Sequence, residues 1–235
     1  MSNLAFSKIW IMVVLITTLI VIIVGGIFWW QLNKVELLTF SPILPSSGFG
    51  TIYASQEEFV IKETPEGKIV ENKIAGLEVK VPQGWEAEKV NIGWDYLLGK
   101  PTDECIVDLT SQDAEFDEKT HLLKKGCGIS IIVGYSEKNV KYKELSRYIR
   151  FVKLLSIFEP QTFKELQEKE KIEVVKVANR SALKVVISEN QAGKGIAIEI
   201  PLKNKILYFD TLFVPGHEER CSQEFNKFLE EVLIK

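Results

Sequence analysis

Residues 76–85 read Gly-Leu-Glu-Val-Lys-Val-Pro-Gln-Gly-Trp, and this stretch decides the fold class. Three aliphatic residues alternate with Glu78 and Lys80, and this period of two predicts a strand with one buried face. The Pro-Gln-Gly sequence ends that strand in a turn. We expect the turn to direct the next side chain, Trp85, into the core.

The same period of two recurs on both sides of this stretch. Residues 58–62 and 68–72 flank Thr-Pro-Glu-Gly, which predicts a hairpin. Downstream, one buried face is predicted for each of the strands that begin at Cys105 and Cys127. Further strands are predicted over residues 172–177, 183–188, 196–200 and 206–213, and their short separators require antiparallel neighbours.

Two stretches have helical rather than strand periodicity. Apolar residues recur every three or four positions over residues 142–157, which predicts an amphipathic helix that ends before Pro160. A short second helix is expected over residues 163–169. A third is expected after Pro215-Gly216, with Cys221, Phe225, Phe228, Leu229 and Val232 as its buried stripe. The fold class is therefore α+β, a largely antiparallel sheet covered by helices.

This order of elements resembles the PsbP-like α/β/α sandwich, which occurs in extrinsic proteins of photosystem II and in small exported bacterial proteins. Those proteins often open with an apolar strand that leads into a Pro-x-x-Trp turn, as residues 81–85 do here, and close with an amphipathic helix. The resemblance covers about residues 70–235. It implies a non-catalytic module that binds a partner, and no metal or partner residue can be transferred from it.

A long apolar run begins at Ile9 and ends at Trp30. A helix rises about 1.5 Å per residue, so about 20 apolar residues cross a hydrocarbon core about 30 Å thick, and this run predicts a transmembrane helix. Tryptophans stand at both ends of the run, where membrane interfaces favour them. The alternative is a cleaved signal peptide, which has a shorter apolar core and an A-x-A-like site.

Lys8 precedes the run, and basic residues favour the cytoplasmic side, so the N-terminus is expected in the cytoplasm. The large C-terminal part is then extracytoplasmic, and the chain is a single-pass protein of the cell membrane. The expected division is residues 1–8 as a cytoplasmic tail, 9–30 as the transmembrane helix, 31–57 as a connector, 58–75 as a hairpin appendage and 76–235 as the extracytoplasmic PsbP-like domain.

Composition and motifs argue against several classes of function. The 29 Lys and Arg residues against 32 Asp and Glu give a net charge of −3, which does not suit a nucleic-acid-binding protein. The sequence contains no Gly-x-Ser-x-Gly, His-Glu-x-x-His or Cys-x-x-Cys motif. We therefore expect no enzyme, with no catalytic residue, no cofactor and no metal site.

One acidic stretch places oxygen ligands at alternate positions, as a calcium loop does: Asp113, Glu115 and Asp117. The EF-hand pattern then requires Gly at its sixth position and Glu at its twelfth, where this chain has Glu118 and Lys124. The stretch, with His121 nearby, therefore predicts a solvated hairpin connection. An adventitious cation is the alternative.

Lys143, Arg147 and Arg150 form a basic stripe on the face of the predicted helix opposite its apolar face, and Lys141 and Lys153 extend it. This candidate partner surface suits anionic lipid or an acidic protein. An ordinary solvated helix face is the alternative.

The three cysteines allow one disulfide, which we expect between Cys105 and Cys127. Both occupy inward-facing positions of their predicted strands. A loop centred on Phe116 would place them opposite each other, within disulfide range. An oxidising compartment outside the membrane permits the bond. Cys221 is then a buried free thiol, and the alternative is three buried thiols.

These expectations lead to a membrane-anchored extracytoplasmic binding or scaffold module, non-catalytic, whose partners are the membrane and an unidentified envelope protein. Two other functions stay open at this point. One is a cell-envelope hydrolase with an unrecognised site, and the other is a carrier of a small ligand.

Overall fold

The computed structural model describes residue 18 and residues 51–92, 94–95, 100–118, 123–136, 140–190 and 193–235. The chain divides into two compact units, Met1–Ser41 and Pro42–Lys235, and the second contains the folded domain. Within the described ranges, no helix is long and apolar enough to cross a membrane. Apart from Thr18, the apolar run predicted to span the bilayer lies outside the described residues.

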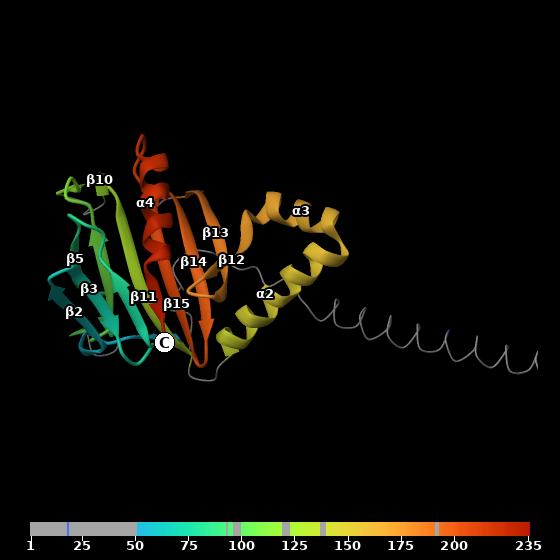
Figure 1. Cartoon of the computed structure of the whole chain (residues 1–235), viewed down its shortest axis with the longest axis horizontal. Coiled ribbons are helices and arrows are strands. Elements are labelled where there is room, and N and C mark those ends of the chain that lie inside the picture. Colours follow the sequence, from blue (N-terminus) through green and yellow to red (C-terminus); the bar gives the residue numbers. More distant parts are fainter. Residues whose placement is uncertain are drawn as a thin grey trace, which may run out of the picture. The chain divides into compact units, whose positions relative to one another are not determined.

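The core of the domain is a large antiparallel sheet, here called the main sheet (Figure 1). Its strands follow the order β12-β13-β14-β15-β11-β8-β5, and β1 also pairs with β11. The strands are β1 (Thr51–Tyr53), β5 (Glu86–Asn91), β8 (Cys105–Thr110), β11 (Gly128–Ser136), β12 (Ile172–Val177), β13 (Arg180–Asn190), β14 (Gly193–Leu202) and β15 (Lys205–Phe213). The prediction of an α+β fold with a largely antiparallel sheet is confirmed.

A second, four-stranded antiparallel sheet has the order β16-β4-β3-β2. Its strands are β2 (Phe59–Thr64), β3 (Gly67–Asn72), β4 (Leu77–Lys80) and β16 (Val232–Ile234). The predicted hairpin is present as β2 and β3, but it is not an appendage. Val70 of β3 is opposite Val79 of β4, and Phe59 of β2 is buried in the main core. The expected domain boundary at residue 76 is therefore wrong.

Helices cover both faces of the main sheet. On one face, α4 (Glu218–Glu230) and the second sheet share a single apolar core with the inward side chains of β8, β11, β14 and β15. On the other face, α2 (Val140–Phe158) contacts β11 to β14 and buries Leu145, Ile149 and Val152. The strand β11 is therefore buried on both sides, with Ile131 in the core shared with α4 and Ile132 on the opposite face.

The remaining described elements are short. A 3-10 turn, η1 (Gln56–Glu58), precedes β2, and α3 (Pro160–Glu170) follows α2 directly. Two small hairpins lie between longer strands: β6 (Trp94–Asp95) with β7 (Lys100–Pro101), and β9 (Glu115–Phe116) with β10 (Leu123–Lys125).

Trp85 is buried, with 8% of its surface exposed, as the sequence predicts. Gly84 before it has a φ of +79°, a conformation that glycine adopts without strain. The backbone N–H of Trp85 donates to the Pro82 carbonyl at 3.0 Å. This turn brings the chain from β4 of the second sheet into β5 of the main sheet. The indole fills the core where the two sheets meet.

Two other boundaries differ from expectation. The connector predicted over residues 31–57 reaches too far, because β1 and η1 belong to the fold and the Ala54 side chain is fully buried. The C-terminal helix ends at Glu230, so Val232 lies in β16 instead of on the helix stripe. Leu233 pairs with Glu78 there, and Lys235 forms a 2.5 Å ion pair with the Glu78 carboxylate.

Candidate docking surface on helix α2

The apolar side of α2 determines how the helix packs on the main sheet. Leu145, Ile149 and Val152 recur at intervals of four and three residues, which puts them on one side of the helix, and all three are buried. The helix ends at Phe158, and Pro160 occupies the first turn of α3. Proline cannot continue a helix interior, so the chain turns and starts a new helix.

The opposite side of α2 faces solvent and contains the predicted basic residues. Lys143, Arg147 and Arg150 are all exposed. Among the described residues, none of the three has an ion pair or a side-chain hydrogen bond. Lys153 differs, because its Nζ donates to Ser181 Oγ at 2.5 Å. The side chain of Lys141 lies outside the described set.

The outward side continues beyond the basic residues with apolar ones, which the sequence reasoning missed. Leu154, Ile157 and Phe158 follow Arg150 at helical intervals, and they are 46%, 70% and 69% exposed. Ile157 and Phe158 are the most exposed large apolar side chains of the described part of the chain. The signal that could have revealed them is the alternation of four- and three-residue steps through positions 143, 147, 150, 154 and 157.

We call these six residues, Lys143, Arg147, Arg150, Leu154, Ile157 and Phe158, the α2 stripe. Cations occupy its N-terminal half and apolar side chains its C-terminal half. Across the whole helix, five basic residues stand against one acidic residue, although the chain as a whole has a net charge of −3. The stripe is thus a local positive and apolar surface on an otherwise slightly acidic protein.

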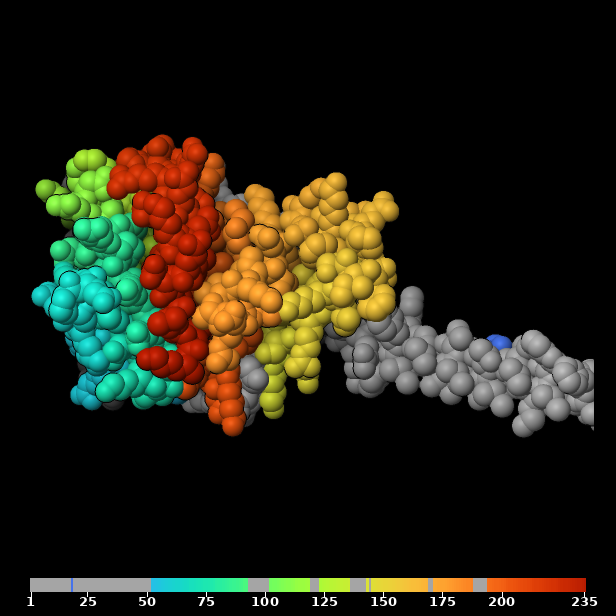
Figure 2. Space-filling view, in the orientation of Figure 1, coloured from blue at the N-terminus to red at the C-terminus, as the bar shows by residue number. Residues whose placement is uncertain are grey.

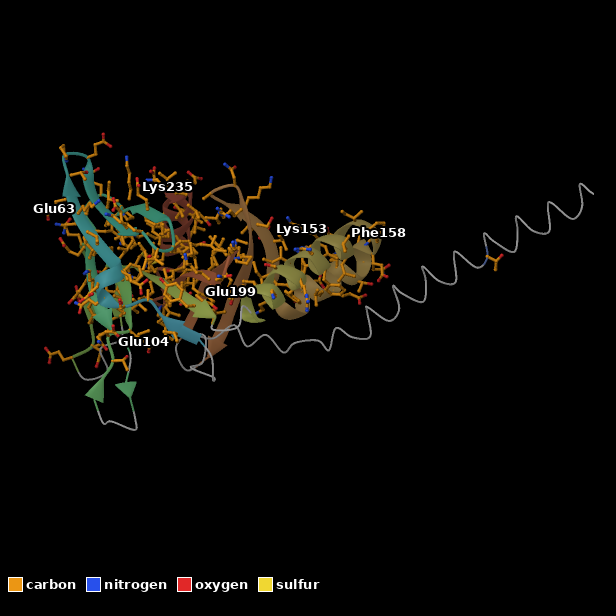
Figure 3. All side chains as sticks on the ribbon, turned by 90° about the horizontal axis from the view of Figure 1, so that it is seen from below. Glu63, Glu104, Lys153, Phe158, Glu199 and Lys235 are labelled. Atoms are coloured by element: carbon orange, nitrogen blue, oxygen red, sulfur yellow. A yellow bond between two sulfur atoms is a disulfide. The ribbon has the colours of Figure 1, made fainter. Side chains whose placement is uncertain are left out.

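The two helices α2 and α3 extend past β12 at the edge of the main sheet (Figure 1). In the space-filling view they form a lobe beside the body of the domain (Figure 2). Lys153 and Phe158 lie along this lobe, with Phe158 farther out, and Glu63 of β2 lies at the other end of the domain (Figure 3). The apolar half of the stripe is therefore presented away from the core.

A second polar feature lies on the α2 side of the main sheet. Asp108, Ser130 and Asp210 are neighbours on three adjacent strands, and Ser130 Oγ donates to Asp108 Oδ1 at 2.6 Å. Burial raises the pKa of both carboxyls, and that of Asp210 reaches about 7 with a further contribution from the Asp108 charge.

The acidic stretch considered as a calcium loop is largely neutralised by cations. Asp113 accepts two hydrogen bonds from Arg220 of α4, at 2.6 and 3.0 Å, and this guanidinium holds the pKa of that carboxyl well below its usual range. Glu115 pairs with Lys125 at 2.6 Å, and Asp117 with Lys124 at 2.7 Å. Within the described ranges, no group of three or more metal-binding side chains comes together, and His121 lies outside them.

The predicted disulfide between Cys105 and Cys127 is wrong. Cys127 is bonded to Cys221, and Cys105 is a buried free thiol. The register explains the difference: Leu109 is opposite Ile129, and the Ser111 N–H donates to the Cys127 carbonyl, so Cys127 lies beside Ser111. Cys105 pairs instead with Asn91 of β5 at the far end of β8. Burial raises the pKa of the Cys105 thiol, which keeps it protonated.

Two surface hollows also lie in the described part of the domain. The larger, about 530 Å³, lies between the β2–β3 turn and the turn before Trp85. The smaller, about 410 Å³, lies where α3 meets β12 and β13, and charged residues such as Glu168 and Lys184 line part of it. Both are open at the surface, and neither includes a residue of the α2 stripe.

Comparison with known proteins adds little to this geometry. No protein-family model matches the chain, and no curated protein matches it. Among solved structures, the chain is similar to the solution structure of cyanobacterial PsbP (CyanoP) from Synechocystis sp. PCC 6803, with 13% sequence identity. The match covers 83% of this chain and 99% of that chain, at a TM-score of 0.38. The fold class given above therefore depends on the strand pairings of this chain itself: an α+β domain built on an antiparallel sheet, with helices on both faces.

Proposed function

We propose that this chain is a membrane-anchored, extracytoplasmic binding or scaffold module without catalytic activity, and that the α2 stripe is its docking surface. The observation that supports this most is the exposure of Ile157 and Phe158 directly after three cations that have no partner within the described residues. Water solvates cations well but not large apolar side chains. A surface that combines both kinds of residue suits a partner that is negatively charged and partly apolar.

The anchor in this proposal is the apolar run of residues 9–30, and its support is the hydropathy of the sequence. The finer assignment to a PsbP-like sandwich also belongs to the proposal. Its support is the order of elements: the strand and turn that end at Trp85, the helix α2, the meander of β12 to β15, and the closing helix α4. Such a domain binds a partner through its surface.

Site-specific photocrosslinking in intact cells tests the docking role. A photoreactive amino acid replaces Arg147 or, as a matched control, Lys73, which is also an exposed cation but lies between β3 and β4. The proposal expects a reproducible adduct at position 147, of protein or of lipid, and none at position 73. Equal yields at both positions, or no adduct at 147, would contradict it.

A further inference from the structure

We infer that the partner of the α2 stripe is an anionic lipid bilayer, on which α2 lies with Phe158 at the acyl boundary and Lys143 among the headgroups. This inference rests on the proposed function and names the partner of that same surface. It depends on three observations: the order of residues along the stripe, the poor fit of a second copy of the chain to the stripe, and the length of chain between the predicted anchor and the domain.

The first observation is the separation of charge and apolar surface along one line. From Lys143 to Ile157 the helix rises about 21 Å at about 1.5 Å per residue. An interfacial helix combines cations that meet lipid phosphates with apolar side chains that enter the boundary between headgroups and acyl chains. A bilayer offers these two environments at different depths, so a slightly inclined α2 satisfies both halves of the stripe at once.

The second observation is that the stripe does not complement the same stripe on a second copy of the chain. If two α2 helices packed in parallel, Arg147 and Arg150 would meet the same cations of the other copy. If they packed antiparallel, these cations would lie against Leu154, Ile157 and Phe158 with no counter-charge, which buries unpaired charge. The stripe is therefore not self-complementary, and an anionic surface fits it better than a second copy does.

The third observation is the length of chain that precedes the domain. Residues 31–50 separate the predicted membrane span from β1, and twenty extended residues reach at most about 70 Å. A domain held within this distance experiences a high effective concentration of bilayer surface. A weak contact between α2 and the lipid is therefore enough to keep the helix on the bilayer. The predicted transmembrane helix alone gives stable attachment, so the contact of α2 sets the orientation of the domain on the bilayer.

The neighbouring helix restricts the orientation. Glu165 and Glu168 of α3 are exposed carboxylates; Glu168 pairs with Lys164 at 3.9 Å, and an anionic surface repels Glu165 most strongly. The bilayer therefore meets the outward side of α2 while these carboxylates of α3 stay in water. This separation makes the contact specific to the outward side of α2.

The test uses the full chain in lipid nanodiscs, with an environment-sensitive dye on Ile157→Cys. Cys127 and Cys221 are bonded and Cys105 is buried, so the introduced thiol is the accessible one among these cysteines. Glu63→Cys is the matched control, because Glu63 is exposed and lies at the far end of the domain (Figure 3). Quenching by spin-labelled lipid then reports whether each dye touches the bilayer.

With one third phosphatidylglycerol in the nanodisc, we expect strong quenching and a blue shift at position 157 and neither at position 63. Pure phosphatidylcholine or high salt should abolish both effects at 157. Each cation near an anionic surface raises the equilibrium constant for docking of α2 on the bilayer roughly fivefold. This constant should therefore fall about a hundredfold in a triple variant with Lys143→Gln, Arg147→Gln and Arg150→Gln. The same charge change at the exposed Lys73, Lys80 and Lys203 should leave it unchanged.

Quenching at 157 that does not depend on anionic lipid, or no quenching at all, would overturn the inference. If quenching is absent but photocrosslinking at position 147 recovers one protein, the stripe binds a protein and the proposed function stands. If neither experiment detects contact, both proposals fail. Near-ultraviolet circular dichroism of each variant confirms that the domain is folded before these outcomes are compared.

Discussion

The bond between Cys127 and Cys221 should be the largest single covalent contribution to the stability of this domain. It joins the start of β11 to the first turn of α4 and closes a loop with a sequence separation of 94. In the chain-entropy treatment, a loop of this size lowers the entropy of the unfolded chain enough to stabilise the fold by about 4.7 kcal/mol at 25 °C. Replacing both cysteines by alanine should therefore destabilise the domain by about 4–5 kcal/mol.

Thermal unfolding of the full chain in mild detergent, followed by near-ultraviolet circular dichroism, measures this loss. For a domain of about 190 residues, each kcal/mol shifts Tm by about 2–4 °C, so the double variant should melt about 10–20 °C below the parent. The control is Cys105→Ala, which removes a buried thiol without touching the bond and should cost about 1 kcal/mol.

Two results would refute this reasoning. One is a loss of less than about 1 kcal/mol in the double variant, which would mean that the bond does not restrict the unfolded chain as the treatment requires. The other comes from alkylation of the denatured, unreduced chain. Only Cys105 should be labelled, and a labelled Cys127 would show that the pairing is different.

Other perturbations test the core, a buried carboxyl and the membrane topology. Trp85→Ala should destabilise the domain by about 3–5 kcal/mol, whereas alanine at Phe116, which is half exposed, should cost less than about 0.5 kcal/mol; similar Tm values for the two variants would contradict the burial of the indole. The pKa of Asp210 is raised to about 7, so ionisation of this carboxyl costs stability as pH rises from about 4 to about 7. Asp210→Asn should thus stabilise the domain in urea unfolding at pH 8 and have little effect near pH 4, and an equal effect at both pH values would exclude this titration. Protease added to whole cells or spheroplasts should digest residues beyond Lys34 of an uncleaved chain, and a protected domain or a mature N-terminus near residue 27 would contradict the topology.

Much of the fold could be predicted from local periodicity. The strand that begins at Leu77, the whole of β12, the meander from β13 to β15 and the helix α2 follow the apolar patterns in the sequence. The burial of Trp85 also follows from the turn before it. These features depend on residues close together in the chain, where a period of two or of 3.6 is visible directly.

The register between β8 and β11 could not be predicted in this way. Cys105 and Cys127 do have the same inward parity, as expected. A period-two pattern, however, is unchanged when one strand slides by two, four or six residues. The pattern therefore determines the face of the sheet on which a residue lies, but not the residue opposite it on the neighbouring strand. The pairing of Cys127 with Cys221 depends further on how α4 crosses the sheet, which is a long-range packing result.

The candidate site was predicted in part. The basic residues of the α2 stripe follow from their helical spacing, and they are exposed as expected. Leu154, Ile157 and Phe158 were not recognised, because apolar residues near a helix end are normally assigned to the core. Their helical spacing from Arg150 places them on the outward side of α2, but the extension of α2 and α3 beyond β12, which leaves this end of the helix uncovered, is a tertiary property.

Contact between the α2 stripe and a partner in the cell can be tested without knowing the partner. Hydroxyl-radical footprinting measures the solvent accessibility of individual side chains, in native membranes and after solubilisation in detergent. We predict that Phe158 and Ile157 are modified strongly in detergent and are protected in native membranes, whereas Phe116, which is half exposed and outside the stripe, is modified equally in both. Equal modification of Phe158 in the two preparations would contradict the claim.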